Sequence, residues 1–162
     1  MEKGRTRREG IEVGLLGATA VAVWFFFVDL IAGHPFYTPF ALGSVLQGFF
    51  GASEPASMPL TILLYTVFHY LAFIVLGLIV STIFNAAERE PAVFFGFIIL
   101  FVGLEILWLG VTLIVEETSA LRNIAWYQIA AANLVAAITM GTYLFRRHRG
   151  VIRKVGHSLR GI

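Results

Sequence analysis

The sequence contains no cysteine, and only 14% of its 162 residues are charged. The absence of cysteine excludes disulfide bonds, thiolate metal sites and thiol chemistry coupled to quinones. An average soluble domain is about half apolar and about a quarter charged. This chain is 58% apolar and has a mean hydropathy of +0.82, which is typical of a membrane protein with a single domain.

Lysine and arginine are missing from part of the chain. Of the twelve, four lie before the first apolar run, Arg89 follows the second run, and six lie after the last run. The connection over residues 33–59 has none, and the connection over residues 116–123 has Arg122 alone. Because cytoplasmic loops are enriched in basic residues, both termini are predicted to be cytoplasmic, in a multi-pass protein of the cell inner (cytoplasmic) membrane. Orientation and anionic lipid account for the basic ends, so no nucleic-acid partner is expected.

Four apolar runs are long enough to cross a bilayer, for which about 20 residues suffice. The first run is too long for the apolar core of a typical signal peptide, so we expect an uncleaved span. The predicted fold class is therefore an all-α membrane protein, a four-transmembrane-helix bundle. A basic cytoplasmic N-terminus over residues 1–10 precedes the membrane domain of residues 11–145, whose spans cover about residues 11–32, 60–85, 91–115 and 124–145.

The connection between the first two spans holds four of the five prolines. Thr38 and Pro39 fit an N-cap followed by proline at the first helical position, which predicts a short helix over about residues 39–50. At roughly twelve residues this helix is too short to cross the bilayer. We therefore expect a short outer helix that is re-entrant or interfacial.

Residues 146–162 form a basic tail in which apolar residues recur at helical spacing, while the basic residues fall elsewhere. This pattern predicts a cytoplasmic amphipathic helix that lies on the membrane surface. The residues expected to bind lipid headgroups are Arg146, Arg147, Arg149, Arg153 and Lys154.

Small residues recur along two of the spans. Gly14, Ala18 and Ala22 are spaced by four in the first span, which predicts a face that a second helix approaches closely. Gly96, Gly103 and Gly110 recur every seven residues in the third span and predict a helix-packing face. Its neighbour is either a helix of the same chain or another subunit.

Polar residues inside the spans mark the candidate site. A charge at the centre of a span costs at least about 2.5–3.5 kcal/mol, so Glu105 needs a partner, a proton or a water-filled cavity. His69, Glu105 and Asn133 are predicted to lie roughly 13–15 Å below the outer surface, at about 1.5 Å of rise per residue. A shallower outer polar layer, roughly 5–8 Å deep by the same rise, is predicted for Asp29, Tyr65 and Gln128.

The polar cluster of His69, Glu105 and Asn133 has two interpretations. In the functional one, Glu105 and His69 exchange a proton or line a small-ligand site. In the structural one, burial protonates Glu105, which bonds to His69 or Asn133 and fixes the register of the helices. A metal site needs three or more ligands and only His69 and Glu105 lie deep enough, so neither a metal nor another cofactor is expected.

No catalytic motif is present, and no catalytic residue is predicted. The leading hypothesis is a small non-enzymatic integral membrane protein that is an accessory or assembly subunit of a membrane complex, or a homo-oligomer. Its predicted partners are the lipid bilayer and either a membrane protein or a second copy of the chain. The alternative is a proton-coupled carrier or channel for a small solute that uses Glu105 and His69. A membrane enzyme acting on a lipid or a quinone is the third hypothesis.

Overall fold

The structure, a computed structural model, describes residues 2–87, the helical positions 96, 98–99, 101–103, 105–107 and 110, and residues 126–148. Within these ranges all regular secondary structure is helical, which confirms the predicted all-α class. The continuous helices are α1 (Glu2–Ile31), α2 (Tyr37–Phe49), α3 (Met58–Ala87) and α5 (Trp126–Arg147).

Three helices in the described part of the chain are long and apolar enough to cross a membrane. They cover Thr6–Ile31, Met58–Ala87 and Tyr127–Arg147, in the positions predicted for the first, second and fourth spans. The predicted third span lies partly outside the described residues, and its described positions between 96 and 110 are helical. The connection over residues 116–123 and the tail over residues 149–162, with Arg149, Arg153 and Lys154, lie outside the described residues.

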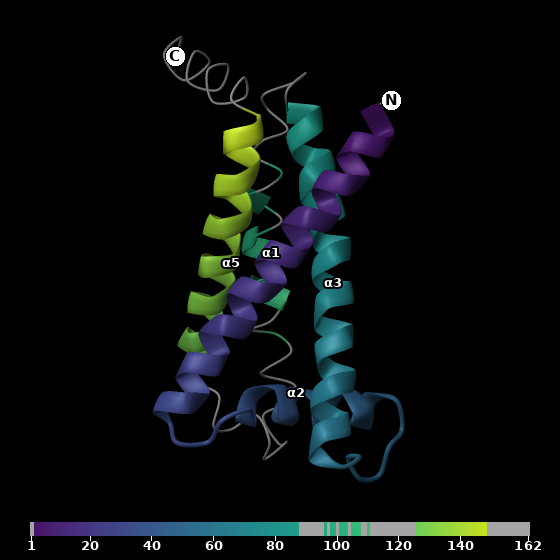
Figure 1. Cartoon of the computed structure of the whole chain (residues 1–162), viewed down its shortest axis with the longest axis vertical. Helices are drawn as coiled ribbons and strands as arrows, with labels where there is room; N and C mark the ends of the chain where they lie inside the picture. Colours follow the sequence, from purple (N-terminus) through teal and green to yellow (C-terminus); the bar gives the residue numbers. More distant parts are fainter. Residues whose placement is uncertain are drawn as a thin grey trace.

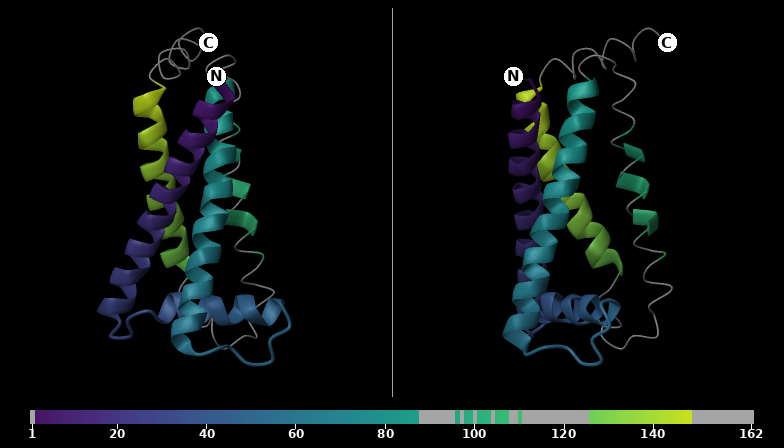
Figure 2. Two further views of the ribbon diagram at one scale, coloured as in Figure 1. Left: turned by 45° about the vertical axis from the view of Figure 1, so that its right-hand side comes forward. Right: turned by 90° about the vertical axis from the view of Figure 1, so that its right-hand side faces the viewer.

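Helix α1 is the centre of the described arrangement. It packs against α3 on one side and against α5 on the other, whereas α3 and α5 have little contact with each other. The start of α1 and the ends of α3 and α5 lie at the same end of the bundle, and α2 lies across the opposite end (Figures 1 and 2). We call these the terminal end and the α2 end.

Two apolar clusters hold α1 in place. At the terminal end, residues of α1, α3 and α5 meet around Phe84 and Leu144, both fully buried. Nearer the α2 end, Val21 and Phe25 of α1 pack against three residues of α5: Ile129, Ala132 and Ala136. Among the described residues α3 contributes only the partly buried Phe73 to the second cluster, and α3 diverges from α1 toward the α2 end (Figure 1).

Helices α1 and α3 are in backbone contact where they cross. A Cβ atom on Gly77 would lie 2.8 Å from the Cα atom of Gly14, and one on Gly14 would lie 2.6 Å from the Cα atom of Ile74. The small-residue face predicted for α1 is correct for Gly14 and Ala18, which are buried. It is wrong for Ala22, which is exposed because the helices have separated there and a cavity lies between them.

The first two helices end in the same way. Gly33 adopts φ 78° after α1, its N–H donates to Leu30 O, and the N–H of His34 donates to Asp29 O. This is the Schellman pattern, in which a left-handed residue lets two backbone N–H groups close the last helical turn. Gly51 (φ 87°) closes α2 with the same pattern. Both turns change the direction of the chain within a few residues, and α2 lies across the end of the bundle (Figure 1).

The short helix predicted between the first two spans exists, but its N-cap was predicted wrongly. Helix α2 begins at Tyr37 after Phe36, which adopts a left-handed conformation at φ 67° and provides no side-chain cap. Thr38 therefore lies within the first turn. The carboxylate of Asp29, at the end of α1, accepts hydrogen bonds from Thr38 N at 2.8 Å and from Thr38 Oγ1 at 2.7 Å. A residue from the preceding helix thus fills the capping role that the local sequence assigned to Thr38.

The backbone contact between α1 and α3 predicts that Gly77→Ala lowers the free energy of unfolding by about 1–3 kcal/mol, because the added methyl group meets backbone that cannot rotate away. Gly48→Ala in α2 is the matched control, since its Cβ would meet no described atom within 4 Å. It should be neutral or stabilise by up to about 1 kcal/mol through helix propensity. Unfolding by SDS in detergent micelles measures both; equal effects would contradict a close helix contact.

Candidate functional site

Polar side chains of the described residues gather at both ends of the bundle. At the α2 end they surround a cavity of about 160 Å³ between α1, α2 and α3, which we call the Asp29 cavity. Most of its wall is apolar or aromatic. Its polar lining residues are Asp29, Thr38, Tyr65, Thr66, His69 and Tyr70.

Asp29 is buried, with 3% of its surface exposed. Both carboxylate oxygens accept from Thr38, in the first turn of α2, where the partial positive charge of a helix N-terminus stabilises an anion. The three residues predicted to form an outer polar layer line two cavities at the α2 end, while their depth in a membrane stays a prediction. Tyr65 lines the Asp29 cavity, and Gln128 lines a second cavity of about 470 Å³ that also contains Asp29 and Thr38.

His69 is held against the backbone of α1. Its Nε2 atom lies 3.1 Å from the carbonyl oxygen of Ala18, and because a carbonyl only accepts, Nε2 donates. The imidazole packs between the rings of Tyr65 and Phe73, with centroids 5.8 Å and 4.7 Å away. The next residue, Tyr70, places its hydroxyl 3.1 Å from Thr19 Oγ1. These contacts fix the α3 side of the Asp29 cavity.

No hydrogen bond joins any two of His69, Glu105 and Asn133 within the described part of the chain. Asn133 is half-buried on α5. Glu105 is also half-buried, and its Oε1 atom is shielded from solvent with no hydrogen-bond partner among the described residues. The partner of Glu105 therefore stays a prediction, while the acceptor for His69 is an α1 carbonyl that the sequence gave no reason to expect.

The glycine face of the third span meets few described atoms. A Cβ on Gly96 would lie 4.0 Å from Ile83, and one on Gly103 or Gly110 would meet no described atom within 4 Å. The packing role predicted for Gly103 and Gly110 thus has no partner among the described residues, and Gly96 has only the Ile83 side chain nearby.

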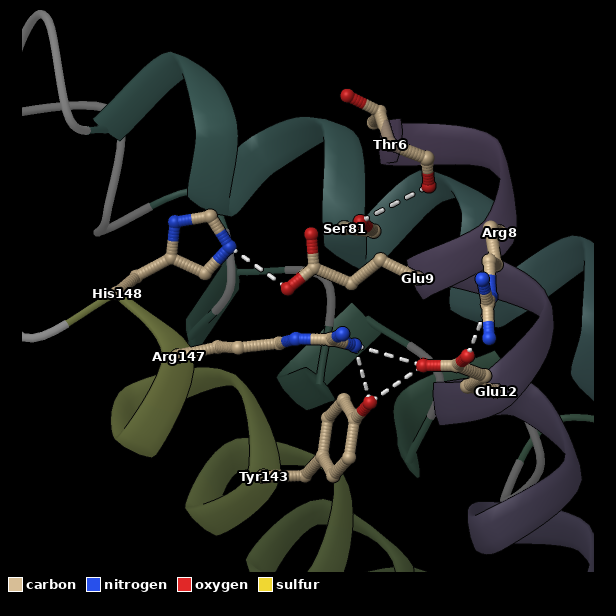
Figure 3. A network of polar contacts seen from close by, with 8 residues as sticks. All are labelled: Thr6, Arg8, Glu9, Glu12, Ser81, Tyr143, Arg147 and His148. Atoms are coloured by element: carbon tan, nitrogen blue, oxygen red, sulfur yellow. Dashed lines mark hydrogen bonds and ion pairs between the residues drawn. The ribbon is translucent and has the colours of Figure 1, made fainter. Parts of the chain in front are cut away.

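A second polar group, which the sequence analysis missed, lies at the terminal end (Figure 3). His148 Nε2 lies 2.8 Å from Glu9 Oε1, and each side chain has only 2% of its surface exposed. One turn further along α1, Glu12 Oε2 accepts from Tyr143 at 2.5 Å and from Arg147 at 2.6 Å. Arg147 also donates to the Tyr143 hydroxyl. We call these residues, together with Arg8 on Glu12 Oε1, the Glu9–His148 network.

The Glu9–His148 network joins the first helix to the last. Glu9 and Glu12 are three residues apart, so both face α5 from one side of α1. Tyr143 and Arg147 are four apart on α5, and His148 continues its last turn through a bond from its N–H to Leu144 O. The spacing was visible in the sequence, but the prediction separated residues 1–10 and 146–162 from the membrane domain, so their pairing was not considered.

The network also changes the expectation for the basic residues of the tail. Arg147 was predicted to bind lipid headgroups, yet its guanidinium contacts the carboxylate of Glu12. Arg146 is exposed at the same end of α5. Lipid binding by Arg146 stays a prediction, as does binding by Arg149, Arg153 and Lys154, which lie outside the described residues.

Among the described residues, no three His, Asp or Glu side chains are arranged to hold a metal ion. Comparison of the chain with protein-family models, with curated proteins and with solved structures finds no match. Function therefore has to be argued from the geometry of the Asp29 cavity, the Glu9–His148 network and the exposed surface.

The buried pair predicts a large effect of single substitutions at the terminal end. His148→Leu leaves the Glu9 carboxylate buried without its imidazole, so the free energy of unfolding should fall by about 3–5 kcal/mol. Glu9→Leu combined with His148→Leu removes both polar groups and should restore most of that loss. Denaturation in SDS measures these differences.

Arg8→Ala is the control for this experiment, because Arg8 is 83% exposed in its ion pair with Glu12. Exposed ion pairs contribute little, so this variant should unfold like the parent chain. A double variant no more stable than His148→Leu alone would contradict the pairing of Glu9 with His148.

Proposed function

We propose that the protein is a multi-pass protein of the cell inner membrane that crosses the bilayer four times, with both termini in the cytoplasm. The terminal end of the bundle carries the basic N-terminus and the basic end of α5, whereas α2 lies at the opposite end, in a connection without Lys or Arg. This distribution supports the orientation by the positive-inside rule. In this arrangement α2 lies at the outer surface as an interfacial or re-entrant helix, and residues 146–162 lie on the inner surface as an amphipathic tail.

The proposed orientation is tested by labelling single cysteines with a membrane-impermeant maleimide, which is clean because the chain has no cysteine of its own. Ser53→Cys, after α2, and Ser119→Cys should react in sealed cells. Ser158→Cys should react only after the cells are opened. Labelling of Ser158→Cys in sealed cells would contradict the orientation.

We further propose that the protein is a non-enzymatic accessory or assembly subunit of a membrane complex, or a homo-oligomer. The main support for this proposal is that the buried polar groups in the described residues bond to other groups of the same chain. Asp29, His69, Glu9 and Glu12 each bond to groups of the same chain, mostly to cap, position or join helices. What the long helices present outward is apolar, as along α3 at Leu63, Val67, Leu71 and Val75, each at least half exposed.

The third span provides a second support for assembly. Gly103 is exposed and Gly110 is half-buried, and neither meets a described atom at its Cβ position. The Oε1 atom of Glu105, between them, has no hydrogen-bond partner in the described part of the chain. A helix of another subunit that packs on these glycines would supply the close contact, whereas Glu105, two positions from Gly103, lies on the opposite side of the helix.

Assembly is tested by native mass spectrometry of the tagged chain, purified from its own membrane in mild detergent. The expected result is a homo-oligomer or a stable complex with other membrane proteins. Gly103→Leu should weaken it by blocking close approach, while Val102→Leu, at an exposed neighbouring position, should leave it intact. A monomer without co-purifying subunits would contradict the proposal.

A proton-coupled carrier that uses Glu105 and His69 is the second candidate, and the unpaired Glu105 Oε1 atom in the described structure favours it. Two results together would support the carrier. The purified chain would be a monomer, and vesicles containing it would show pH-dependent solute uptake that Glu105→Gln abolishes. Glutamine keeps the shape of the side chain but holds no exchangeable carboxyl proton. An active Gln variant would leave Glu105 as a packing residue.

A further inference from the structure

Asp29 is a buried carboxylate without a cationic partner in the described structure. Among the described residues its carboxylate accepts hydrogen bonds from Thr38 alone, and the chain has no Lys or Arg between Arg8 and Arg89. An N-terminal helix dipole offsets about half of one charge, so α2 compensates the carboxylate only in part. Capping alone does not require a charge either, because asparagine and serine cap helices about as well as aspartate. The described residues therefore place no full positive charge beside this buried carboxylate to offset its charge.

This charge faces a cavity with aromatic walls. Phe26 of α1 and Phe36 before α2 contact each other on one side, with ring centroids 5.8 Å apart. On the α3 side the rings of Tyr65 and His69 stack at 5.8 Å, and Tyr70 lies beside them. The Nε2 atom of His69 and the hydroxyl of Tyr70 are already bonded to α1.

We propose that the Asp29 cavity is a binding site for a small alkylammonium cation. Aromatic faces attract such cations through the ring quadrupole, and the carboxylate supplies the opposite charge. The cavity of about 160 Å³ has the volume of one molecule of benzene size, since an engineered apolar cavity of about 150 Å³ binds benzene. A bound anion would be repelled by Asp29, and a bare metal ion would lack the further oxygen ligands that it requires.

The second cavity offers a route to the carboxylate. It shares Asp29 and Thr38 with the first, and His34, Tyr37 and Gln128 line it at the α2 end of the bundle. Asp29 therefore lies where the two cavities meet. The alkylammonium group comes either from a free solute or from the headgroup of a lipid such as phosphatidylcholine. Both carry the same quaternary ammonium group.

The test uses the full chain in nanodiscs of phosphatidylglycerol, a lipid without an ammonium group. Binding of choline is compared by calorimetry with that of 3,3-dimethylbutan-1-ol, which has the same shape but no charge. We expect choline to bind at least about tenfold tighter. Asp29→Asn keeps a carbonyl acceptor for Thr38 and should abolish this preference. Glu54→Gln removes an exposed acid near the same end, outside the cavity lining, and should preserve the preference.

Tyr65→Leu keeps the apolar lining but removes one ring, so it should weaken choline binding several-fold even if Asp29→Asn does not fold. Equal affinity for choline and its neutral analogue, absence of saturable choline binding, or loss of the preference in Glu54→Gln would each overturn the proposal. Nanodiscs that also contain phosphatidylcholine identify the source of the cation. Competition with choline assigns the site to the lipid headgroup, and unchanged choline affinity assigns it to a free cation.

Discussion

The backbone contact between α1 and α3 sets the geometry of the other described helices. Where Gly14 and Gly77 meet, side chains are absent and the two helix axes approach as closely as their backbones allow. Lipid is as apolar as a leucine side chain, so burial gives little drive for helices to associate in a membrane, and close packing has to replace it. The helices separate on the α2 side of this point. Their separation creates the space that α2 closes and that the aromatic side chains line.

Polar side chains complete this arrangement at the two ends. At the α2 end Asp29 links α1 to the first turn of α2, and Gln47 bonds both to Thr61 of α3 and to the N–H of Ala56. At the terminal end the Glu9–His148 network links α1 to α5. Away from water an unpaired polar group costs more than it does in solution, so each pairing also selects one arrangement of the helices. The middle of the bundle depends mainly on small residues and apolar side chains instead.

The elements that sequence predicts well here are those with a strong local signal. Length and hydropathy identified α1, α3 and α5 because a bilayer imposes about the same apolar length on every span. The short helix α2 was predicted from Thr38 and Pro39 taken as an N-cap and the first helical residue. The helix exists, but the residue that caps it was missed because Asp29 lies nine residues before Thr38. Position along each helix predicted a shared depth for Asp29, Tyr65 and Gln128; these residues line two cavities at the α2 end, and their depth in a membrane stays a prediction.

Local sequence patterns did not predict the contacts that depend on how each helix is rotated about its own axis. His69 was expected to face other polar side chains, but the closest acceptor is a backbone carbonyl, and every residue of α1 has one. Glu9 and His148 were missed because the basic N-terminus and the amphipathic tail were treated as segments separate from the spans. Residue type alone does not distinguish a basic end that faces lipid from one that pairs with an acid on another helix. That distinction comes from the crossing of α1 with its neighbours.

The distance along the chain between Glu9 and His148 has a consequence for biosynthesis. The two residues are 139 positions apart, so the partner of Glu9 is among the last residues of the described chain to leave the ribosome. Until then a carboxylate at the start of α1 has no imidazole and is more stable in water than in a closed bundle. α1 and α3 can pack as soon as both are inserted, but the terminal end closes only once α5 has arrived. A chain released before residue 148 would lack this pairing and keep the terminal end open, with the Glu9 carboxylate in contact with water.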